Sequence, residues 1–427
     1  MKPEIKERID KINRGQVPEG YKKSKFGIIP EDWDIKKLKE VTDYVDYRGK
    51  TPRKVAEGVF LVTAKNIKEG YIDYNISKEY VSEEEYDLIM KRGKPKIGDV
   101  LFTTEAPLGN VAQVDRENIA LAQRVIKFRG KNNLSNDYLK YYLLGEIFQS
   151  LLKNKAIGST VLGIQGKQLH NLEICVPLIE EQQKIADILS TWDKAIELKE
   201  KLIEQKKELK KGLMQKLLTG EVRLPGFEGE WKEVKLKDLG VLKAGSAFPE
   251  KYQNQLNGKY PFFKVSDMNN EENEKYMLTA NNYISEDIRT ELKASVIPKN
   301  SIVFAKVGAA LFLERKRLLK FDSCIDNNMM ALVVKENIDF SFVYYLLLNM
   351  KLSRYSNVGA LPSLNSKDVY SIKCKVPETF EEQKAISRFL SLFDKEISLL
   401  QNELLSIEQQ KKGLMQLLLT GKVRVKV

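Results

Sequence analysis

The chain has 427 residues, of which 42% are hydrophobic and 30% charged, so it is long enough for two or three domains with cores of their own and too apolar to be disordered. Its formal net charge of +12 favours a polyanionic partner, although a lysine-rich surface kept for solubility gives the same number. Three cysteines without a CxxC pair, a charged first stretch and the lack of any uncharged run of ~20 apolar residues predict a cytosolic protein without a signal peptide or a membrane span.

Residues 1–19 are predicted to form an N-terminal helical segment. The stretch RGQVPEG from Arg14 resembles TGEVRLPG from Thr219, which closes a long predicted helix further on. We therefore expect residues 4–14 to correspond to the end of a helix that would precede the first half, as in a circularly permuted dimer.

Residues 20–178 are predicted to form a first globular domain. Short alternating apolar runs such as VFLVTA, separated by Gly, Asn and Pro, indicate a mixed α/β fold. Its loops combine cations with amides, which can bind phosphates and pair with base edges, although each loop alone is more typical of an ordinary solvated surface. The candidate DNA-binding residues in this half are Arg48, Lys50, Arg53, Lys65, Asn66, Gln123 and Arg124.

Residues 179–220 are predicted to form one long helix that begins after Pro177 and stops at Gly220. Its apolar stripe is interrupted by Lys199, Lys206 and Lys210, so Leu202 and Leu209 are alternative members of the seam. The residues assigned to helix packing and subunit docking are Ile185, Leu189, Trp192, Leu213, Met214 and Leu217.

Residues 226–378 are predicted to form a second mixed α/β domain. Its matching loops, KVSDMNN, AKVGAALFLERKR and DSCIDNNMMAL, carry the same mixture of cations and amides. The candidate DNA-binding residues here are Lys264, Asn269, Lys306, Arg315, Arg317 and Asn327.

Residues 380–421 are predicted to form a second long helix that stops at Gly421. Apolar residues recur in steps of three and four, the period of a coiled-coil seam. The residues assigned to packing and docking are Ile386, Leu390, Phe393, Leu414, Met415 and Leu418.

The two helices are copies of one another. Residues 180–223 and 381–424 align without a gap, about half of the 44 positions agree, and both copies contain KKGLMQ followed by LLTG. Two related helices in one chain are expected to pack antiparallel, as in a two-fold dimer. The predicted fold class is therefore α+β, with two mixed α/β domains joined by two long antiparallel helices and an internal pseudo-two-fold repeat.

Sequence signatures of catalysis are missing. The chain has no GxxxxGK[ST], GxSxG, HExxH, DPPY or NPPY motif, and its single histidine, His170, is expected to be a structural or a surface residue. We therefore predict no catalytic residue, no metal site and no cofactor in this chain, and a binding function.

The duplicated KKGLMQ helix end, the P…EEQ entry to each long helix and the opening IPEDWDIKKLKEV make the whole chain resemble the specificity subunit of type I restriction–modification enzymes. The resemblance implies two target-recognition domains at 20–178 and 226–378, each reading half of an asymmetric bipartite site in double-stranded DNA. It implies spacer helices at 179–220 and 380–421 that set the gap and dock two modification subunits. S-adenosylmethionine, ATP and Mg²⁺ are then expected only in the modification and restriction subunits, and the complex in the cytoplasm.

Two alternatives remain open. The helices could belong to a coiled-coil scaffold that gathers partner proteins without binding DNA, or the chain could be an orphan specificity subunit without modification partners. An autonomous nuclease or methyltransferase is disfavoured by the missing motifs.

Overall fold

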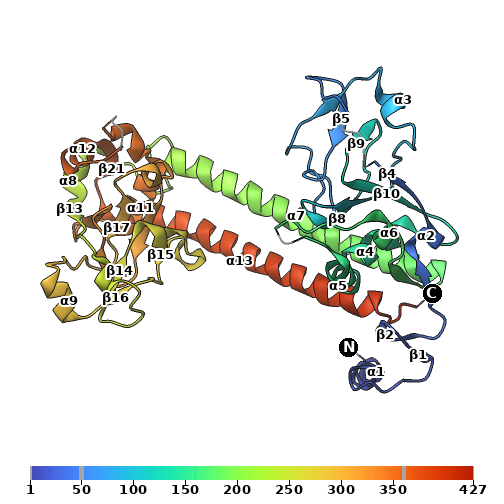
Figure 1. The fold of residues 1–427 in the computed structure, drawn as a ribbon. Helices are drawn as coiled ribbons and strands as arrows, with labels where there is room; N and C mark the ends of the chain where they lie inside the picture. The colour runs from blue at the N-terminus through green and yellow to red at the C-terminus, as the bar shows by residue number, and fades with distance from the viewer. Residues whose placement is uncertain (1, 48–51, 159, 358–361, 427) are drawn as a thin grey trace. The chain divides into compact units, whose positions relative to one another are not determined.

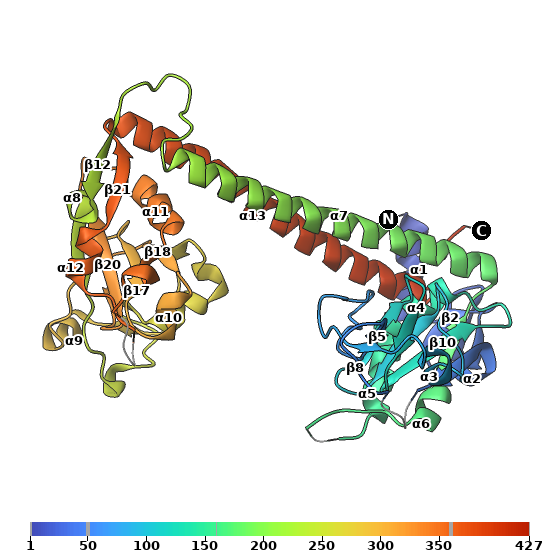
Figure 2. The same cartoon turned by 90° about the horizontal axis from the view of Figure 1, so that it is seen from above.

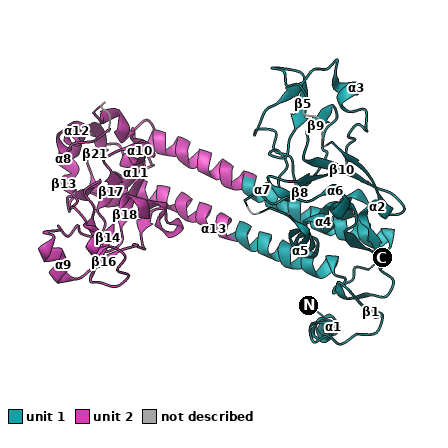
Figure 3. Ribbon diagram, in the orientation of Figure 1, with its two compact units in different colours: residues 1–200, 403–427 teal, residues 201–402 magenta. Residues whose placement is uncertain are grey.

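The computed structural model describes residues 2–47, 52–158, 160–357 and 362–426, and it divides into two compact units (Figure 3). Unit 1 contains residues 1–200 and 403–427, and unit 2 contains residues 201–402. Both divisions fall inside a long helix, so each unit combines one globular domain with part of each helix. No helix among the described residues has the length and apolar character needed to cross a membrane.

Unit 1 begins with helix α1 (Pro3–Asn13) and the hairpin of β1 (Tyr21–Ser24) and β2 (Gly27–Pro30). The part from β3 to β11 is called the first domain. Its elements are β3 (Asp34–Lys37), α2 (Leu38–Val41), β4 (Thr42–Asp46), β5 (Val59–Val62), β6 (Tyr80–Val81), α3 (Tyr86–Ile89), β7 (Val100–Thr104), β8 (Leu108–Gln113), β9 (Ile119–Leu121), β10 (Val125–Gly130), α4 (Asn136–Leu144), α5 (Glu146–Lys155), α6 (Gly166–His170) and β11 (Glu173–Val176).

Unit 2 contains the second domain, which runs from β12 to β21. Its strands are β12 (Trp231–Lys235), β13 (Gly240–Ala244), β14 (Tyr260–Phe263), β15 (Tyr276–Met277), β16 (Tyr283–Ile284), β17 (Ile302–Ala305), β18 (Lys316–Leu319), β19 (Cys324–Ile325), β20 (Met329–Val334) and β21 (Lys373–Pro377). Its α-helices are α8 (Leu236–Leu239), α9 (Glu286–Glu291), α10 (Ala309–Phe312), α11 (Phe340–Asn349) and α12 (Ser366–Ser371). The 3₁₀ turns are η1 (Glu250–Tyr252), η2 (Val265–Asn269), η3 (Glu271–Asn273) and η4 (Leu352–Tyr355).

The two domains share one sheet topology although their sequences hardly match. The order β4-β10-β7-β8 in the first domain corresponds to β13-β20-β17-β18 in the second, where β15 adds a further strand. Each domain also has a three-stranded sheet with one parallel pair. Its order is β6-β5-β9 in the first domain and β16-β14-β19 in the second. The predicted mixed α/β class is confirmed, and the repeat extends through the domains as well as the helices.

The long helices are α7 (Ile179–Leu217) and α13 (Phe380–Leu419), which lie side by side in both views (Figures 1 and 2). In unit 1, Asp193 of α7 pairs with Lys411, and Lys199 pairs with Glu403 at 2.8 Å. In unit 2, Lys206 pairs with Glu396 at 2.6 Å and Lys210 with Asp394. Since partner numbers fall as α7 numbers rise, the helices run antiparallel, as predicted.

These pairs correct one expectation about the seam. Lys199, Lys206 and Lys210 stay on the α7 stripe half-buried, with their ammonium groups on acids of α13. Leu202 and Leu209, the alternative seam residues, are 36% and 51% exposed and do not replace them. A long lysine stem can cover apolar surface while its charge reaches an acid at the rim, so the stripe tolerates lysine.

Each domain core is completed by both helices. The first core receives the start of α7 with Ile185 and Leu189 and the end of α13 with Leu418. The second core receives Ile386 and Leu390 from the start of α13, together with Met214 and Leu217 from the end of α7. The globular domains are therefore built onto the helix pair and share its apolar residues.

A buried glutamate marks the start of each long helix. Glu181 accepts hydrogen bonds from the indole of Trp33 at 2.9 Å and from the guanidinium of Arg424. Glu382 accepts the same bonds from Trp231 at 3.2 Å and from Arg223. Charge-assisted bonds of this kind compensate the burial of a carboxylate.

Candidate nucleic-acid interface

In the first domain, three strand ends meet at one edge. The backbone N–H of Ala122 donates to Val62 O at 2.9 Å, and Thr104 N–H donates to Arg124 O at 2.9 Å. The loop after β5, the loop after β7 and the turn between β9 and β10 are therefore neighbours. This edge brings together the candidate residues Lys65, Gln123 and Arg124.

The second domain builds the same edge with different side chains. Asp326 N–H donates to Phe263 O at 2.9 Å, and Lys306 N–H donates to Asn328 O at 2.9 Å. The loops after β14 and β17 and the turn between β19 and β20 thus lie together. The candidates Lys264, Lys306 and Asn327 belong to this edge.

A further loop joins each edge, and the sequence reasoning missed it. Ile164 N–H donates to Thr104 O at 3.1 Å, and Leu364 N–H donates to Lys306 O at 2.8 Å. Before them lie a bridge between Glu105 and Gly163 and one between Val307 and Ser363. The available signal was positional, because Gly163 and Ser363 stand at the same distance before Pro177 and Pro377. We call these sets of loops the loop edges, residues 63–70, 105–107, 122–124 and 160–163 in the first domain and 264–270, 306–308, 326–328 and 362–363 in the second.

Most polar candidates at the first loop edge are open to solvent. Lys65, Gln123 and Arg124 are exposed, and Arg124, in the left-handed region at φ 72°, lies 3.5 Å from Glu105. Arg53 is exposed as well, and no hydrogen bond or ion pair among the described residues links it to the loop edge. Arg48 and Lys50 lie outside the described residues.

The environment of Asn66 does not support its predicted role as a base reader. It is 0% exposed, and its carboxamide accepts bonds from Thr63 N and Oγ1 and donates to Asp73 O and Ile76 O. In the second domain, Asp267 accepts the N–H of Lys264 in the same way, and burial raises its pKa. Asn and Asp at this position hold the loop in shape by bonding its backbone.

At the second loop edge, Asn327 is exposed and Lys306 half-buried, while Lys264 donates to Gln253 Oε1 at 3.0 Å. Asn269 accepts a bond from Arg315, which joins η2 to the segment before β18. Arg317 lies elsewhere, since its guanidinium donates to Asn273 O and Lys316 O and lines a pocket beside the long helices. The structure does not place Arg317 at the loop edge.

Burial separates packing from docking among the predicted helix residues. Ile185, Leu189, Met214, Leu217, Ile386, Leu390 and Leu418 are buried, and Trp192, Leu213, Phe393, Leu414 and Met415 are half-buried. Exposed leucines lie on other faces, with Leu198, Leu202 and Leu209 along one face of α7 and Leu392 and Leu399 along one face of α13. These leucines are the apolar helix surface that a partner could reach.

His170 is 6% exposed and its ring stacks on Tyr44, with 3.5 Å between ring centroids. These contacts agree with the expected structural role. Among the described residues no group of three or more His, Cys, Asp or Glu side chains is arranged to hold a metal ion.

Comparison with known proteins gives the chain its family. The type I restriction modification DNA specificity domain matches twice, at residues 30–208 and 228–409. The chain is 31% identical over 440 residues to the putative type I restriction enzyme MjaX specificity subunit of Methanocaldococcus jannaschii, covering 96% of this chain and 97% of that one.

Two solved structures share the fold. The S subunit of a type I restriction–modification system from M. genitalium has a TM-score of 0.53 at 17% identity, over 90% of this chain and 96% of that one. A chain from a study of complex assembly and conformational transition of the type I R-M system has a TM-score of 0.60 at 16% identity, over 92% and 99%. The two domain matches, one in each half and together spanning most of the sequence, show that this chain belongs to the type I restriction–modification DNA specificity subunits, which recognise DNA through two target-recognition domains and are not themselves catalytic.

Proposed function

We propose that this chain reads an asymmetric bipartite sequence in double-stranded DNA, with one half-site for each loop edge. The observation that carries the proposal is that the two edges have the same backbone frame and different side chains. Gln123 and Arg124 occupy the turn that Asn327 and Asn328 occupy in the second domain. Amides and guanidinium groups pair with different base edges, so different side chains on one frame select different bases.

The recognition domains are proposed to span residues 20–178 and 226–378. Residues 179–220 and 380–421 then act as spacer helices between them, with residues 1–19 as a separate N-terminal segment. A reader with two domains on one face of DNA needs half-sites roughly 34–36 Å apart, or one helical turn.

The same helices are proposed to dock two modification subunits, which in turn assemble with restriction subunits. The exposed leucines support this part of the proposal. Leu198 and Leu399 are equivalent in the repeat and are 54% and 55% exposed. Apolar side chains kept at equivalent exposed positions of two helices suit two copies of one partner. S-adenosylmethionine, ATP and Mg²⁺ would be bound by these partner subunits, and the complex would act in the cytoplasm.

The decisive experiment is to co-express the chain with its neighbouring modification subunits in a methylation-free host and to map N6-methyladenine across the genome. We expect one asymmetric motif of two short half-sites around a fixed unspecified gap. In the same assay, Gln123→Ala should relax the first half-site only, and Asn327→Ala the second only. A soluble complex that leaves the genome unmethylated would contradict the proposal.

A separate experiment tests the spacer role. Inserting one helical turn at matched positions in the exposed middle of α7 and α13 should lengthen the gap in the methylated motif and leave both half-sites unchanged. An unchanged gap would refute the role of the helices as a ruler.

A scaffold that gathers proteins without reading DNA remains the competing function. A DNA reader that contacts phosphates must lose affinity steeply as salt rises, because each contact releases a counterion. Affinity that is weak and independent of salt would favour the scaffold.

A further inference from the structure

A pocket of about 1030 Å³ lies in unit 2 between the end of α7, the first half of α13 and the second domain. Lys207 and Lys211 line it from α7, Lys395 from α13, and Lys275, Arg317 and Lys351 from the second domain. Cations from three separate parts of the unit therefore face a single cavity.

The acids of this pocket do not neutralise those cations. Seven of its lining side chains are Lys or Arg and three are Asp or Glu. Asp394 binds Lys210 and Lys275 together, the latter at 2.7 Å. Glu314 is engaged by the buried Lys316, which lies outside the pocket lining, and by the backbone N–H groups of Leu352 and Ser353. A clear excess of positive charge remains.

Three of the cations have no ion pair among the described residues, although the charge of Glu274, the third acid of the lining, acts on Arg317. Lys351 and Lys395 are exposed and have neither a side-chain hydrogen bond nor an ion pair among the described residues. Arg317 donates only to the carbonyl oxygens of Asn273 and Lys316, and burial lowers its pKa. A partly buried guanidinium bonded only to carbonyls keeps its full charge, which an anion in the pocket would compensate.

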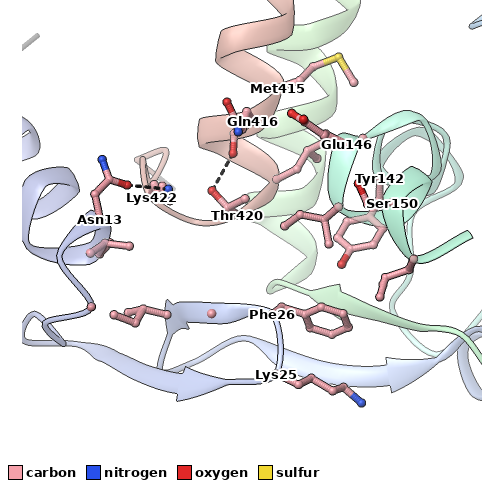
Figure 4. Close-up of a pocket in the computed structure, with 18 of the residues that line it drawn as sticks. Asn13, Lys25, Phe26, Tyr142, Glu146, Ser150, Met415, Gln416, Thr420 and Lys422 are labelled. Carbon is pink, nitrogen blue, oxygen red and sulfur yellow. Dashed lines mark hydrogen bonds between the residues drawn. The ribbon is translucent and has the colours of Figure 1, made fainter. Parts of the chain in front are cut away.

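Part of this charge has no equivalent in the first half. By the repeat and the strand register, Lys207, Arg317 and Lys351 correspond to Glu408, Ala112 and Ile147. The other lysines of the repeated helices in the lining, Lys210, Lys211 and Lys395, do have lysine counterparts, namely Lys411, Lys412 and Lys194. A pocket does lie beside Met415 and Gln416, the counterparts of Met214 and Gln215, but two cations and one acid line it (Figure 4). One of those cations, Lys422, donates to Asn13 Oδ1 at 2.9 Å. The cationic pocket therefore combines three lysines of the repeated helices with Lys207, Arg317 and Lys351, whose counterparts in unit 1 carry no positive charge.

We propose that the pocket of unit 2 binds a phosphate group. Compact oxyanions suit a cavity ringed by lysines, and a guanidinium can bind two phosphate oxygens at once. The phosphate has two possible sources with the same chemistry, namely the DNA backbone beside the second half-site or a free polyphosphate. The first source rests on the proposed function, and the second does not.

The test uses the full chain and the double variant Lys351→Gln/Lys395→Gln, whose side chains are exposed and unpaired. The matched control is Lys299→Gln/Lys335→Gln, which removes the same charge from exposed positions of unit 2 outside the pocket. Tripolyphosphate binding is measured by titration calorimetry, and binding of an unrelated 20-bp duplex by fluorescence anisotropy over a range of salt.

If the pocket takes a free polyphosphate, the double variant should bind tripolyphosphate at least tenfold more weakly than wild type and the control. If it takes the DNA backbone, the slope of log affinity against log salt should become shallower by about 1 for each lost phosphate contact. Wild-type behaviour of the double variant in both assays would overturn the proposal. So would a loss confined to binding of the modification subunit, which would identify a protein site. The methylated motif stays unchanged in each case, so failure here is distinct from failure of the proposed function.

Discussion

In both units an arginine binds the buried glutamate at the start of a long helix, but the arginine comes from a different segment of the chain in each. In unit 2, Arg223 reaches Glu382 from the segment that follows α7 and leads directly into the second domain. In unit 1, the equivalent bond to Glu181 comes from Arg424, which lies in the segment after α13. Arg424 also binds Asp32, which stands about 390 residues earlier in the sequence. Equivalent contacts are thus made by the preceding segment in one domain and by the far end of the sequence in the other.

This difference teaches that the repeat conserves contacts and not connectivity. Gly220 and Gly421 both adopt positive φ beside a tryptophan, Trp231 and Trp33 respectively. A Cβ at Gly421 would lie 2.3 Å from Pro30, so only glycine fits there. The segment after α13 is as much a part of the first domain as the residues of that domain.

The largest loss of stability is expected when the segment after α13 is removed. Deleting residues 421–427 leaves Glu181 buried with the Trp33 indole as its remaining partner, which should destabilise unit 1 by about 3–5 kcal/mol. Calorimetry should show a lower transition temperature, and hydrogen exchange should rise in the first domain and not in the second. Lys426→Ala is the control, and equal loosening of both domains would contradict the comparison.

A smaller loss of stability is expected at the first loop edge, where it distinguishes a residue that holds the loop in shape from one proposed to read bases. Asn66→Ala removes the four hydrogen bonds of a buried carboxamide and should lower the free energy of unfolding by about 2–3 kcal/mol. Gln123→Ala, at an exposed position of the same loop edge, should leave stability unchanged. Urea unfolding measures both. A stable Asn66→Ala protein with an altered half-site would show that this asparagine reads DNA after all.

The helix seam offers a gain in stability instead of a loss. Replacing Lys199 and Lys206 by Leu gives α7 the apolar stripe that α13 has at Leu400 and Ile407. The ion pairs lost are to half-exposed acids and contribute little, so we expect stabilisation of about 1 kcal/mol or less. Lys412→Leu, at an exposed position off the seam, is the control, and a clear loss of stability would show that the pairs matter more than the apolar contact.

The smallest expected effect is a loss of stability of unit 2 at acid pH. Burial alone would raise the pKa of Asp394, but Lys210 and Lys275 outweigh it and hold that pKa below its usual value. Asp394 therefore stabilises the fold above the unfolded pKa of about 3.9 and loses this contribution as pH falls through its folded pKa. Asp394→Asn should flatten the dependence of unfolding free energy on pH below about 4, and an unchanged curve would assign the acid sensitivity to other groups.

Features that depend on neighbouring residues, such as the long helices and their duplication, are predictable from the sequence. The three-and-four spacing predicted α7 and α13, and the paired KKGLMQ ends predicted the duplication. The seam lysines are harder to place, because their position depends on acids about 190 to 200 residues away. The burial of Asn66 is hidden for a different reason, since residue type alone does not tell an exposed carboxamide from one that bonds its own loop. Arg317 is predicted to read DNA because it belongs to the basic run ERKR, and no sequence pattern shows that its side chain lies on the side of the strand that faces the helices.

The chain carries three copies of the Gly-x-Val helix ending, at Gly15, Gly220 and Gly421, but only two of its three tryptophans, Trp33 and Trp231, stand at the start of a domain where such a glycine packs. Gly421 takes the place beside Trp33, and no atom of the described residues lies within 4 Å of where a Cβ of Gly15 would be. Gly15 therefore lacks the packing against a tryptophan that constrains Gly220 and Gly421. Among related chains, substitutions should accumulate around Gly15 while Gly421 stays invariant, which makes the start of the chain the freer of its two ends to acquire a new role.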